Sequence, residues 1–362
     1  MNKLYIELIS NDLSINKWQV EHCIELLEDG STVPFISRYR KEKTGSLDEV
    51  QIAQIKHYQS KFVELDKRKK TICSSIEEQG KLTDQLINLI EECVDIQKLE
   101  DIYLPYKPKR KTRASIAREK GLEPLAEIIF KFNTTNPGLT AEKFLSEFVL
   151  TIDQALEGSR DIIAEWVSEN VKVREALRNQ YLKYAKIISK KHKDIEKDSE
   201  SKFSNYFDFS GNISNTPAHR ILAILRGERE GALSVRLEID SYYSIEAIKR
   251  IIYFENKLIN SQCKEQIDIA IDDSYKRLLH PSIENEVLKN SKYRADIESI
   301  KVFGDNLNSL LLAPPAGQKR VLAIDPGFRT GCKIVCLGNQ GELLYNDTIY
   351  PHPPVNEKIQ AI

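Results

Sequence analysis

The chain has 362 residues, of which 41% are hydrophobic and 30% are charged, and its formal net charge is −1. A chain of this length can form two or three domains, each with its own hydrophobic core. The near-neutral charge excludes a global basic field that would pull the whole chain onto nucleic acid, so such binding would have to come from local patches. There is no apolar run near the length of a membrane span, and the first residues do not open a signal peptide.

The cysteines are scattered, and none of them forms a Cys-x-x-Cys pair. This spacing favours reduced thiols in the cytoplasm over a disulfide framework or a zinc site. The histidines show no metal-binding spacing, and no Walker, dinucleotide or Gly-x-Ser-x-Gly motif is present. We therefore expect a cytoplasmic protein without a cofactor or a metal.

Most of the chain is predicted to form helices. Ser46 and Glu49 have the spacing of a capping box, and apolar residues then recur at helical spacing until Gly80. A helix of roughly 30 residues with such a narrow seam is predicted to lie in an antiparallel, coiled-coil-like contact. A second long helix is predicted from Ile152 to about Lys191. One half-buried strand is predicted from Leu233 to Ile239, and helices then continue to Leu312.

The C-terminal part changes character after a Pro- and Gly-rich linker. Apolar runs that begin at Val321 and Cys332, and a third run over 342–349, are separated by turn residues and predict a three-stranded meander. Asp325 ends the first run, in the place where RNase H-like enzymes carry their first metal-binding carboxylate. The sequence stops at Ile362 before a crossover helix or a second carboxylate, so we expect only the start of a truncated domain.

Asp325 by itself does not make a catalytic site. Metal-dependent nucleases use two or more carboxylates from separate elements to hold their ions. The alternative is that Asp325-Pro326-Gly327 is a turn in which the aspartate caps nearby amides. We favour a non-catalytic residue, a vestigial candidate at most.

A basic loop at 107–113 is the main candidate for nucleic-acid binding. Lys107, Lys109, Arg110, Lys111 and Arg113 are five cations in seven residues without a carboxylate among them. Two prolines favour an extended, fixed backbone, and Tyr103 and Tyr106 stand beside it. Such a loop suits phosphate neutralisation with optional base stacking. The alternative is a solubilising surface loop or one paired with acidic helices.

Arg38, Arg40 and Lys41 form a second basic cluster, which Lys43 extends and Glu42 dilutes. We predict that it contributes to the same binding, with a solvated helix face as the alternative.

Several segments, in order along the whole chain, resemble the Tex family of bacterial transcription accessory proteins. They are Thr32–Glu42, Leu99–Arg113, Gly121–Ala126, His219-Arg220 with Arg226-Gly227, Ala313–Gly317 and Asp325–Gly331. The resemblance implies an N-terminal helical region with a helix-turn-helix-like element, then a YqgF-type RNase H-like domain. It also implies helix-hairpin-helix units and an OB-fold RNA-binding domain, which this sequence does not contain. The family is not generally regarded as an active nuclease.

Together these observations predict a mainly α protein. An elongated multi-helix body over 1–312 would include the helix-turn-helix-like element, a linker would occupy 313–318, and the first β-hairpins of a truncated α/β RNase H-like domain would follow over 319–362. The expected function is a non-enzymatic factor that binds RNA or DNA and serves as a scaffold in transcription or RNA handling. A resolvase-type nuclease and a docking module for RNA polymerase or the ribosome are the alternatives. We expect partners among nucleic acids and the transcription or translation machinery, and no membrane.

Overall fold

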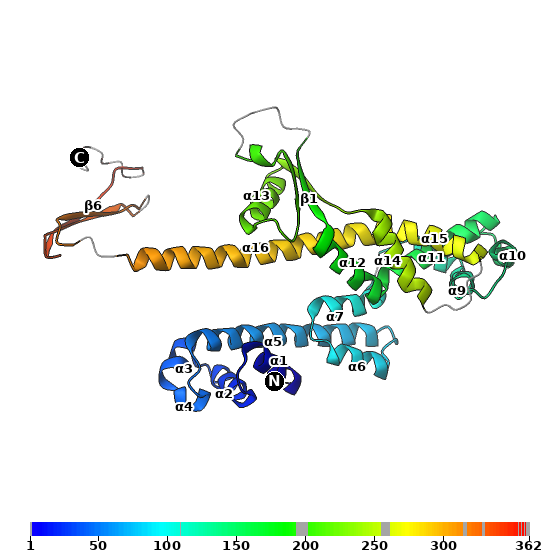
Figure 1. Cartoon of the computed structure of the whole chain (residues 1–362), viewed down its shortest axis with the longest axis horizontal. Coiled ribbons are helices and arrows are strands. Elements are labelled where there is room, and N and C mark those ends of the chain that lie inside the picture. The colour runs from blue at the N-terminus through cyan, green and yellow to red at the C-terminus, as the bar shows by residue number, and fades with distance from the viewer. Residues whose placement is uncertain are drawn as a thin grey trace. The chain divides into compact units, whose positions relative to one another are not determined.

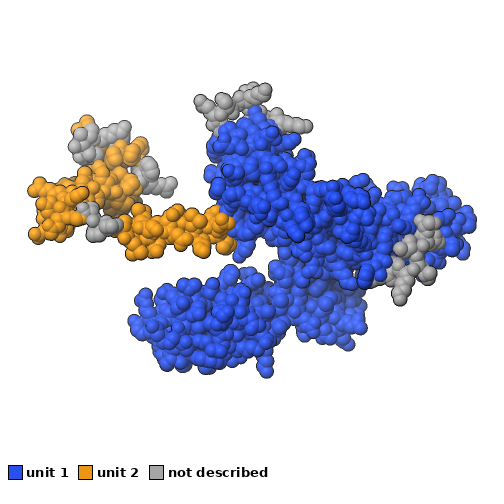
Figure 2. Space-filling view, viewed as in Figure 1, with its two compact units in different colours: residues 1–295 blue, residues 296–362 orange. Residues whose placement is uncertain are grey.

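The computed structural model describes residues 2–108, 110–192, 202–254, 261–313, 317–327, 330–353, 355, 357 and 359. The chain divides into two compact units, residues 1–295 and 296–362 (Figure 2). The first unit is mostly helical and contains one small sheet, and the second unit contains another. The predicted fold class, mainly α with β-hairpins at the C-terminal end, is confirmed.

The N-terminal lobe, residues 3–106, is built around one long helix, α5 (Glu49–Glu77). The other elements of the lobe are α1 (Lys3–Leu13), α2 (Lys17–Glu28), α3 (Val33–Tyr39), α4 (Lys41–Thr44), α6 (Asp84–Glu92), α7 (Ile96–Tyr103) and the 3₁₀ helix η1 (Leu104–Tyr106). The apolar seam of α5 is buried against these elements, with Ile52, Ile55, Ile72 and Ile76 fully inaccessible to solvent. Figure 1 shows α3 and α4 near the start of α5, and α6 and α7 near its end.

Two expectations about α5 were wrong. The helix packs against short helices, α1, α2, α3, α6 and α7, and not against one long antiparallel partner. Its capping box is formed by Asp48 and Gln51, where Asp48 Oδ1 accepts from Gln51 N at 2.7 Å and Gln51 Oε1 accepts from Asp48 N at 3.1 Å. Ser46 lies two residues earlier with φ of 64°, so the backbone is still turning there and cannot cap the helix.

The central lobe, residues 113–295, has its own core. Its first helices are α8 (Arg113–Glu119), α9 (Glu123–Phe130), α10 (Pro137–Ala141), α11 (Ile152–Glu169) and α12 (Val171–Tyr184), with the 3₁₀ helix η2 (Glu142–Phe144) after α10. The helix predicted over 152–191 was wrong because the chain turns at Asn170, whose ψ is 117° and whose side chain caps α12 through Val173 N. A second turn at Ala185 then leads into a strand.

A three-stranded antiparallel sheet of the order β2-β1-β3 follows α12. Its strands are β1 (Lys186–Lys191), β2 (Asp208–Asn212) and β3 (Leu233–Glu238), with the 3₁₀ helix η3 (Ser204–Tyr206) and α13 (Ala218–Arg229) between them. The strand predicted at 233–239 is therefore present, but it is not the only strand in this region. Residues 186–191, which were predicted to end a long helix, form the strand β1. Residues 193–201, between β1 and η3, lie outside the described residues.

The remaining helices of the first unit are α14 (Ser241–Phe254), α15 (Ser261–Asp273), a π-helical turn (Ser274–Leu279) and the first part of α16 (His280–Leu311). The core of the central lobe gathers Ile162, Ile163, Leu177 and Tyr181 from α11 and α12, together with apolar side chains of α14, α15 and α16. This core fixes the helices that border the sites described below.

The second unit contains the predicted meander. Strands β4 (Val321–Asp325), β5 (Cys332–Leu337) and β6 (Leu343–Ile349) form an antiparallel sheet of the order β4-β5-β6. A turn closed by a hydrogen bond from Gly341 N to Gly338 O at 3.0 Å joins β5 to β6. Leu322 and Ile324 on β4 are 62% and 57% exposed.

Among the helices of the described ranges, none has the length and apolarity to cross a membrane.

Candidate nucleic-acid interface

The basic loop at 107–113 connects η1 to α8, and both of its ends are anchored. Upstream, Gln79 Nε2 donates to Tyr106 O at 2.7 Å. Downstream, Thr112 is the N-cap of α8: its Oγ1 accepts from Ser115 N at 3.0 Å and its amide donates to Ser115 Oγ at 2.8 Å. Fixed ends reduce the conformational entropy that would be lost when the loop binds a ligand.

The cations on this loop point into solvent. Lys107, Arg110, Lys111 and Arg113 are all exposed, whereas Lys109 lies outside the described residues. Lys111 Nζ lies 3.7 Å from Glu119 Oε2, and both side chains are about two-thirds exposed, so this pair contributes little. In the described part of the chain, Lys107, Arg110 and Arg113 form no ion pair. The charges of Lys107 and Arg110 are therefore available to a phosphate backbone, whereas Arg113 also interacts with Asp161 and opposes the rise in the pKa of that carboxyl that burial causes.

The two tyrosines beside the loop are not stacking surfaces. Tyr103 is only 7% exposed, its hydroxyl lies 2.9 Å from Ser75 Oγ, and Arg68 covers its ring at 5.4 Å. Tyr106 is partly buried against the core of the N-terminal lobe. The tyrosines hold the loop in place, and the predicted base stacking on Tyr103 would require its burial to be undone.

Arg118, close to the loop in sequence, is also structural. Its Nη1 lies 2.6 Å from Glu165 Oε1 and its Nε lies 3.0 Å from Glu123 Oε1. Burial lowers the pKa of Arg118, but the hydrogen bonds to these two carboxylates outweigh it, so the net shift is upward. Arg118 therefore does not add to the basic surface of the loop.

The second basic cluster lies where α3 meets α4. Arg38 is the last basic residue of α3, Arg40 is the junction residue with φ of −131°, and Lys41 begins α4. Arg38 and Lys41 are exposed and Arg40 is half-buried. In the part of the chain that the structure describes, none of the three is in an ion pair.

This cluster contains aromatic residues that sequence reasoning missed. Phe35 and Tyr39 are 38% and 63% exposed, and their ring centroids are 5.5 Å apart. The Arg40 guanidinium lies 5.1 Å from the centre of the Phe35 ring. The signal was available, because residues four apart on a helix share one face. Exposed rings beside cations favour this cluster over Tyr103 as a stacking surface.

The structure does not bring the two clusters together. The α3–α4 cluster lies beside the start of α5, and the basic loop is anchored to Gln79, just beyond the end of α5 (Figure 1). The helix between them is 29 residues long, about 40 Å at 1.5 Å per residue. They are two separate patches on one framework.

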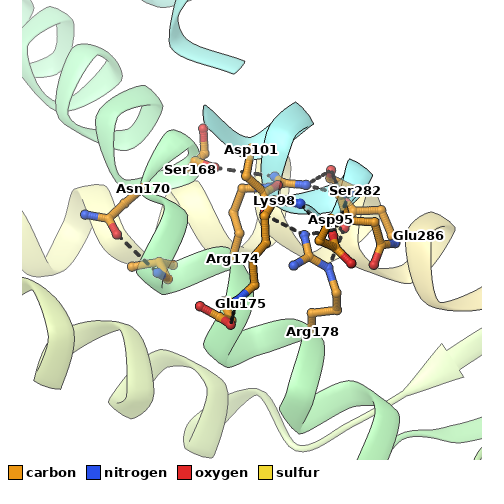
Figure 3. Close-up of polar contacts among 12 residues, drawn as sticks. Asp95, Lys98, Asp101, Ser168, Asn170, Arg174, Glu175, Arg178, Ser282 and Glu286 are labelled. Atoms are coloured by element: carbon orange, nitrogen blue, oxygen red, sulfur yellow. Dashed lines mark hydrogen bonds and ion pairs between the residues drawn. The ribbon is translucent and has the colours of Figure 1, made fainter. Parts of the chain in front are cut away.

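An ionic network holds α7, which leads into the basic loop, onto the central lobe (Figure 3). Asp101 on α7 accepts from Arg174 Nε at 2.7 Å and from Arg178 Nη2 at 2.8 Å, and all three side chains are less than 10% exposed. Glu286 on α16 also contacts both arginines. Burial lowers the pKa of Arg178, but its bonds to Asp101 and Glu286 outweigh this effect, so the net shift is upward and the Arg178 guanidinium stays charged in the interior.

This network balances two arginines against two carboxylates, so its net charge is zero. Asp101, the arginine pair and Glu286 come from three distant parts of the sequence, and none of these residues was predicted to take part in a network. Arg174 and Arg178 lie four apart on α12 beside the buried positions Val173 and Leu177, which is the one local sign that they face inward. Because both arginines form ion pairs inside the protein, they do not add to the basic surface.

Asp325 ends β4, is exposed, and lies opposite Lys333 of β5 in the strand register. Across the described ranges, no group of three or more His, Cys, Asp or Glu residues could hold a metal ion. Asp325 therefore belongs to no described cluster of three or more such ligands, the kind of cluster that would hold a catalytic metal pair.

Three family models match the chain. The model of the Tex-like protein N-terminal domain matches residues 3–77, the Tex central region-like model matches 133–303, and the Tex protein YqgF-like domain matches 319–362. The α3–α4 cluster falls inside the first match, and the basic loop falls between the first and the second.

Curated relatives align along nearly the whole chain. A Bacillus subtilis protein named uncharacterized protein YdcI is 41% identical over 98% of this chain and 49% of its own length. The transcriptional accessory protein Tex of Neisseria gonorrhoeae is 38% identical over 96% of this chain and 46% of its own. The human S1 RNA-binding domain-containing protein 1 is 30% identical over 97% of this chain and 36% of its own. The chain thus spans about half the length of its bacterial relatives.

Proposed function

Because this chain belongs to the Tex family, we propose that it is a non-enzymatic nucleic-acid-binding factor and a scaffold in transcription or RNA handling. One relative is named a transcriptional accessory protein and another an S1 RNA-binding domain-containing protein. In this proposal the chain works in the cytoplasm with RNA or DNA, and its protein partners belong to the transcription or translation machinery. Residues 1–312 serve as the helical region, 313–318 as a linker, and 319–362 as the start of the RNase H-like domain.

The observation that carries the proposal is the basic loop. Three of its described cations have no ion-pair partner in the described ranges, and the fourth, Lys111, has a distant and exposed one. The loop is anchored at both ends, to Gln79 and to α8. A cation on a fixed loop releases counterions from a phosphate backbone without a large ordering cost. Since the net charge is −1, binding depends on such patches.

A variant with Lys107, Arg110 and Lys111 replaced by Gln tests this proposal. We expect weaker binding to RNA or DNA oligonucleotides and a plot of log affinity against log salt that is flatter by up to about 3 units, roughly one for each lost phosphate contact. The measurement is fluorescence anisotropy across a salt series.

The matched control replaces Lys56, Lys67 and Lys70 by Gln. These lysines are exposed on α5, so the control has the same net charge as the loop variant. Its salt dependence should match that of the unmodified chain. Unmodified affinity and slope in the loop variant would overturn the proposal.

A further inference from the structure

The α3–α4 cluster, formed by Arg38, Arg40 and Lys41, carries a net positive charge. Lys43 extends it, so residues 33–45 hold four cations and a single carboxylate, that of Glu42. In the ranges that the structure describes, none of the four cations forms an ion pair. The cluster can therefore attract phosphate groups, as the basic loop does.

The Tyr39 ring is the accessible aromatic surface of this cluster. Tyr39 is 63% exposed, and the Phe35 ring lies beside it, one turn earlier on α3, at a tilt of 45°. The Arg40 guanidinium covers the Phe35 ring, whereas no described cation lies over Tyr39. Ile36 is fully buried and fills the core at this helix, so Tyr39 is not needed there. An aromatic ring thus remains accessible beside the cations.

Contacts with α2 fix the position of α4. Gln19 Nε2 donates to Thr44 O at 3.0 Å and to Gly45 O at 3.1 Å, at the end of α4. His22 Nδ1 lies 2.9 Å from Lys43 O, and Thr44 is fully buried. A ligand that binds this surface therefore pays little conformational entropy to order the backbone of the cluster.

A duplex and a single strand offer different groups to such a surface. Both present phosphates, but the bases of a duplex are stacked on one another, and only an unpaired base can lie on a protein ring. We propose that the α3–α4 cluster binds a single-stranded segment of nucleic acid. One unpaired base stacks on Tyr39, and the cations of the cluster hold the neighbouring phosphates.

This inference rests on the proposed nucleic-acid function and assigns different tasks to the two patches. Of the rings beside the basic loop, Tyr103 is buried and Tyr106 packs against the core of the N-terminal lobe, so the loop contributes phosphate contacts. The α3–α4 cluster contacts phosphates and a base. Loss of the loop cations should change the salt dependence of binding, whereas loss of Tyr39 should change its dependence on the base.

The test compares two fluorescein-labelled strands of about five nucleotides, near the lower end of the site sizes of single-strand-binding proteins. One strand carries its bases, and the other has abasic sugars throughout, so both have the same phosphates. Strands of this length are too short to span the distance between the cluster and the basic loop. We expect the strand with bases to bind about 10-fold more tightly in anisotropy titrations, as for one base–aromatic stack.

Variants of Tyr39 locate the stacking. Tyr39→Ala should remove the preference for bases and leave the salt slope unchanged, since the substitution removes a ring and no charge. Tyr39→Phe keeps the ring and should keep the preference. The matched control is Tyr242→Ala on α14, which removes a ring that is 64% exposed and should have no effect. The preference should also persist in the loop variant, in which the competing phosphate site is weakened.

Equal affinity for the two strands, or a preference for bases that survives in Tyr39→Ala, would overturn the inference. Neither result would touch the proposed function, which the salt slope of the loop variant tests separately. Absence of binding by both strands and by longer RNA or DNA would overturn both. A glutamate peptide that bound as tightly as the strand with bases, and lost affinity in Tyr39→Ala, would indicate a protein-binding surface and contradict the inference.

Discussion

Asp101 shows how one residue can join two lobes. Its carboxylate is buried against two arginines of the neighbouring lobe. Burying such a network is not strongly stabilising in itself, because desolvation offsets much of the attraction. Removing one member is different, since two arginine charges would then remain in the interior with a single carboxylate.

We expect Asp101→Asn to lower the free energy of unfolding by about 3 kcal/mol or more. Urea unfolding followed by tryptophan fluorescence can measure this, because Trp18 reports on the N-terminal lobe and Trp166 on the central lobe. The control is Glu100→Gln, which removes a half-exposed pair with Arg68 and should cost about 1 kcal/mol or less. Similar costs for the two variants would show that the network is not important for stability.

Asp325 allows a second prediction at the residue scale. We expect the chain to cleave no RNA or DNA in the presence of Mg²⁺ or Mn²⁺, because one exposed carboxylate cannot hold two ions. Gel analysis of labelled duplex and junction substrates would measure this. Cleavage that survives stringent purification and disappears in Asp325→Ala would refute the prediction.

At the scale of elements, the meander and α11 differ in burial. In α11, Ile162, Ile163 and Val167 are completely buried, whereas Leu322 and Ile324 of β4 are more than half exposed. Local opening is easiest where few apolar contacts must be broken.

Hydrogen exchange should therefore be much faster for amides of β4, β5 and β6 than for those of α11. Mass spectrometry of peptides from 321–349 and from 152–169 gives the comparison. Equal protection of both segments would show that the exposed strands are covered in solution, and that their apolar side chains have found a partner.

At the scale of the first unit, the two basic patches lie about 40 Å apart along α5. One duplex of about 12 base pairs spans that distance at 3.4 Å per step. A nucleic acid that reaches both patches binds the second one intramolecularly, at a high effective concentration.

We therefore expect a duplex of about 24 base pairs at 3.4 Å per step to lose affinity both in the loop variant and in a variant with Arg38 and Lys41 replaced by Gln. A duplex of about 6 base pairs can reach only one patch and should be much less affected by at least one of the two variants. Anisotropy titrations of both lengths with both variants measure this. If the two variants affected both lengths equally, the patches would not act on one ligand.

Sequence reasoning located the basic residues of the candidate interface but not their surroundings. Local composition was sufficient for the loop cations, because an uncompensated run beside prolines has to be exposed. It could not show that Tyr103 is buried under Arg68, or that Arg118 pairs with Glu165, since both depend on contacts between separate segments.

The sequence by itself determined the helical class, the buried seam of α5 and the meander at 321–349, because apolar periodicity and turn residues act over a few positions. Tertiary structure decided three other features. The helix predicted from Ile152 ends at Asn170, residues 186–191 form the strand β1, and Asp101 forms ion pairs with Arg174 and Arg178. A charged, mixed segment such as 186–191 becomes a strand only where β2 and β3 supply partners for its backbone. Buried charges likewise require partners of opposite charge. The local sequence cannot identify those partners here, because Asp101 and the two arginines lie about 70 or more residues apart.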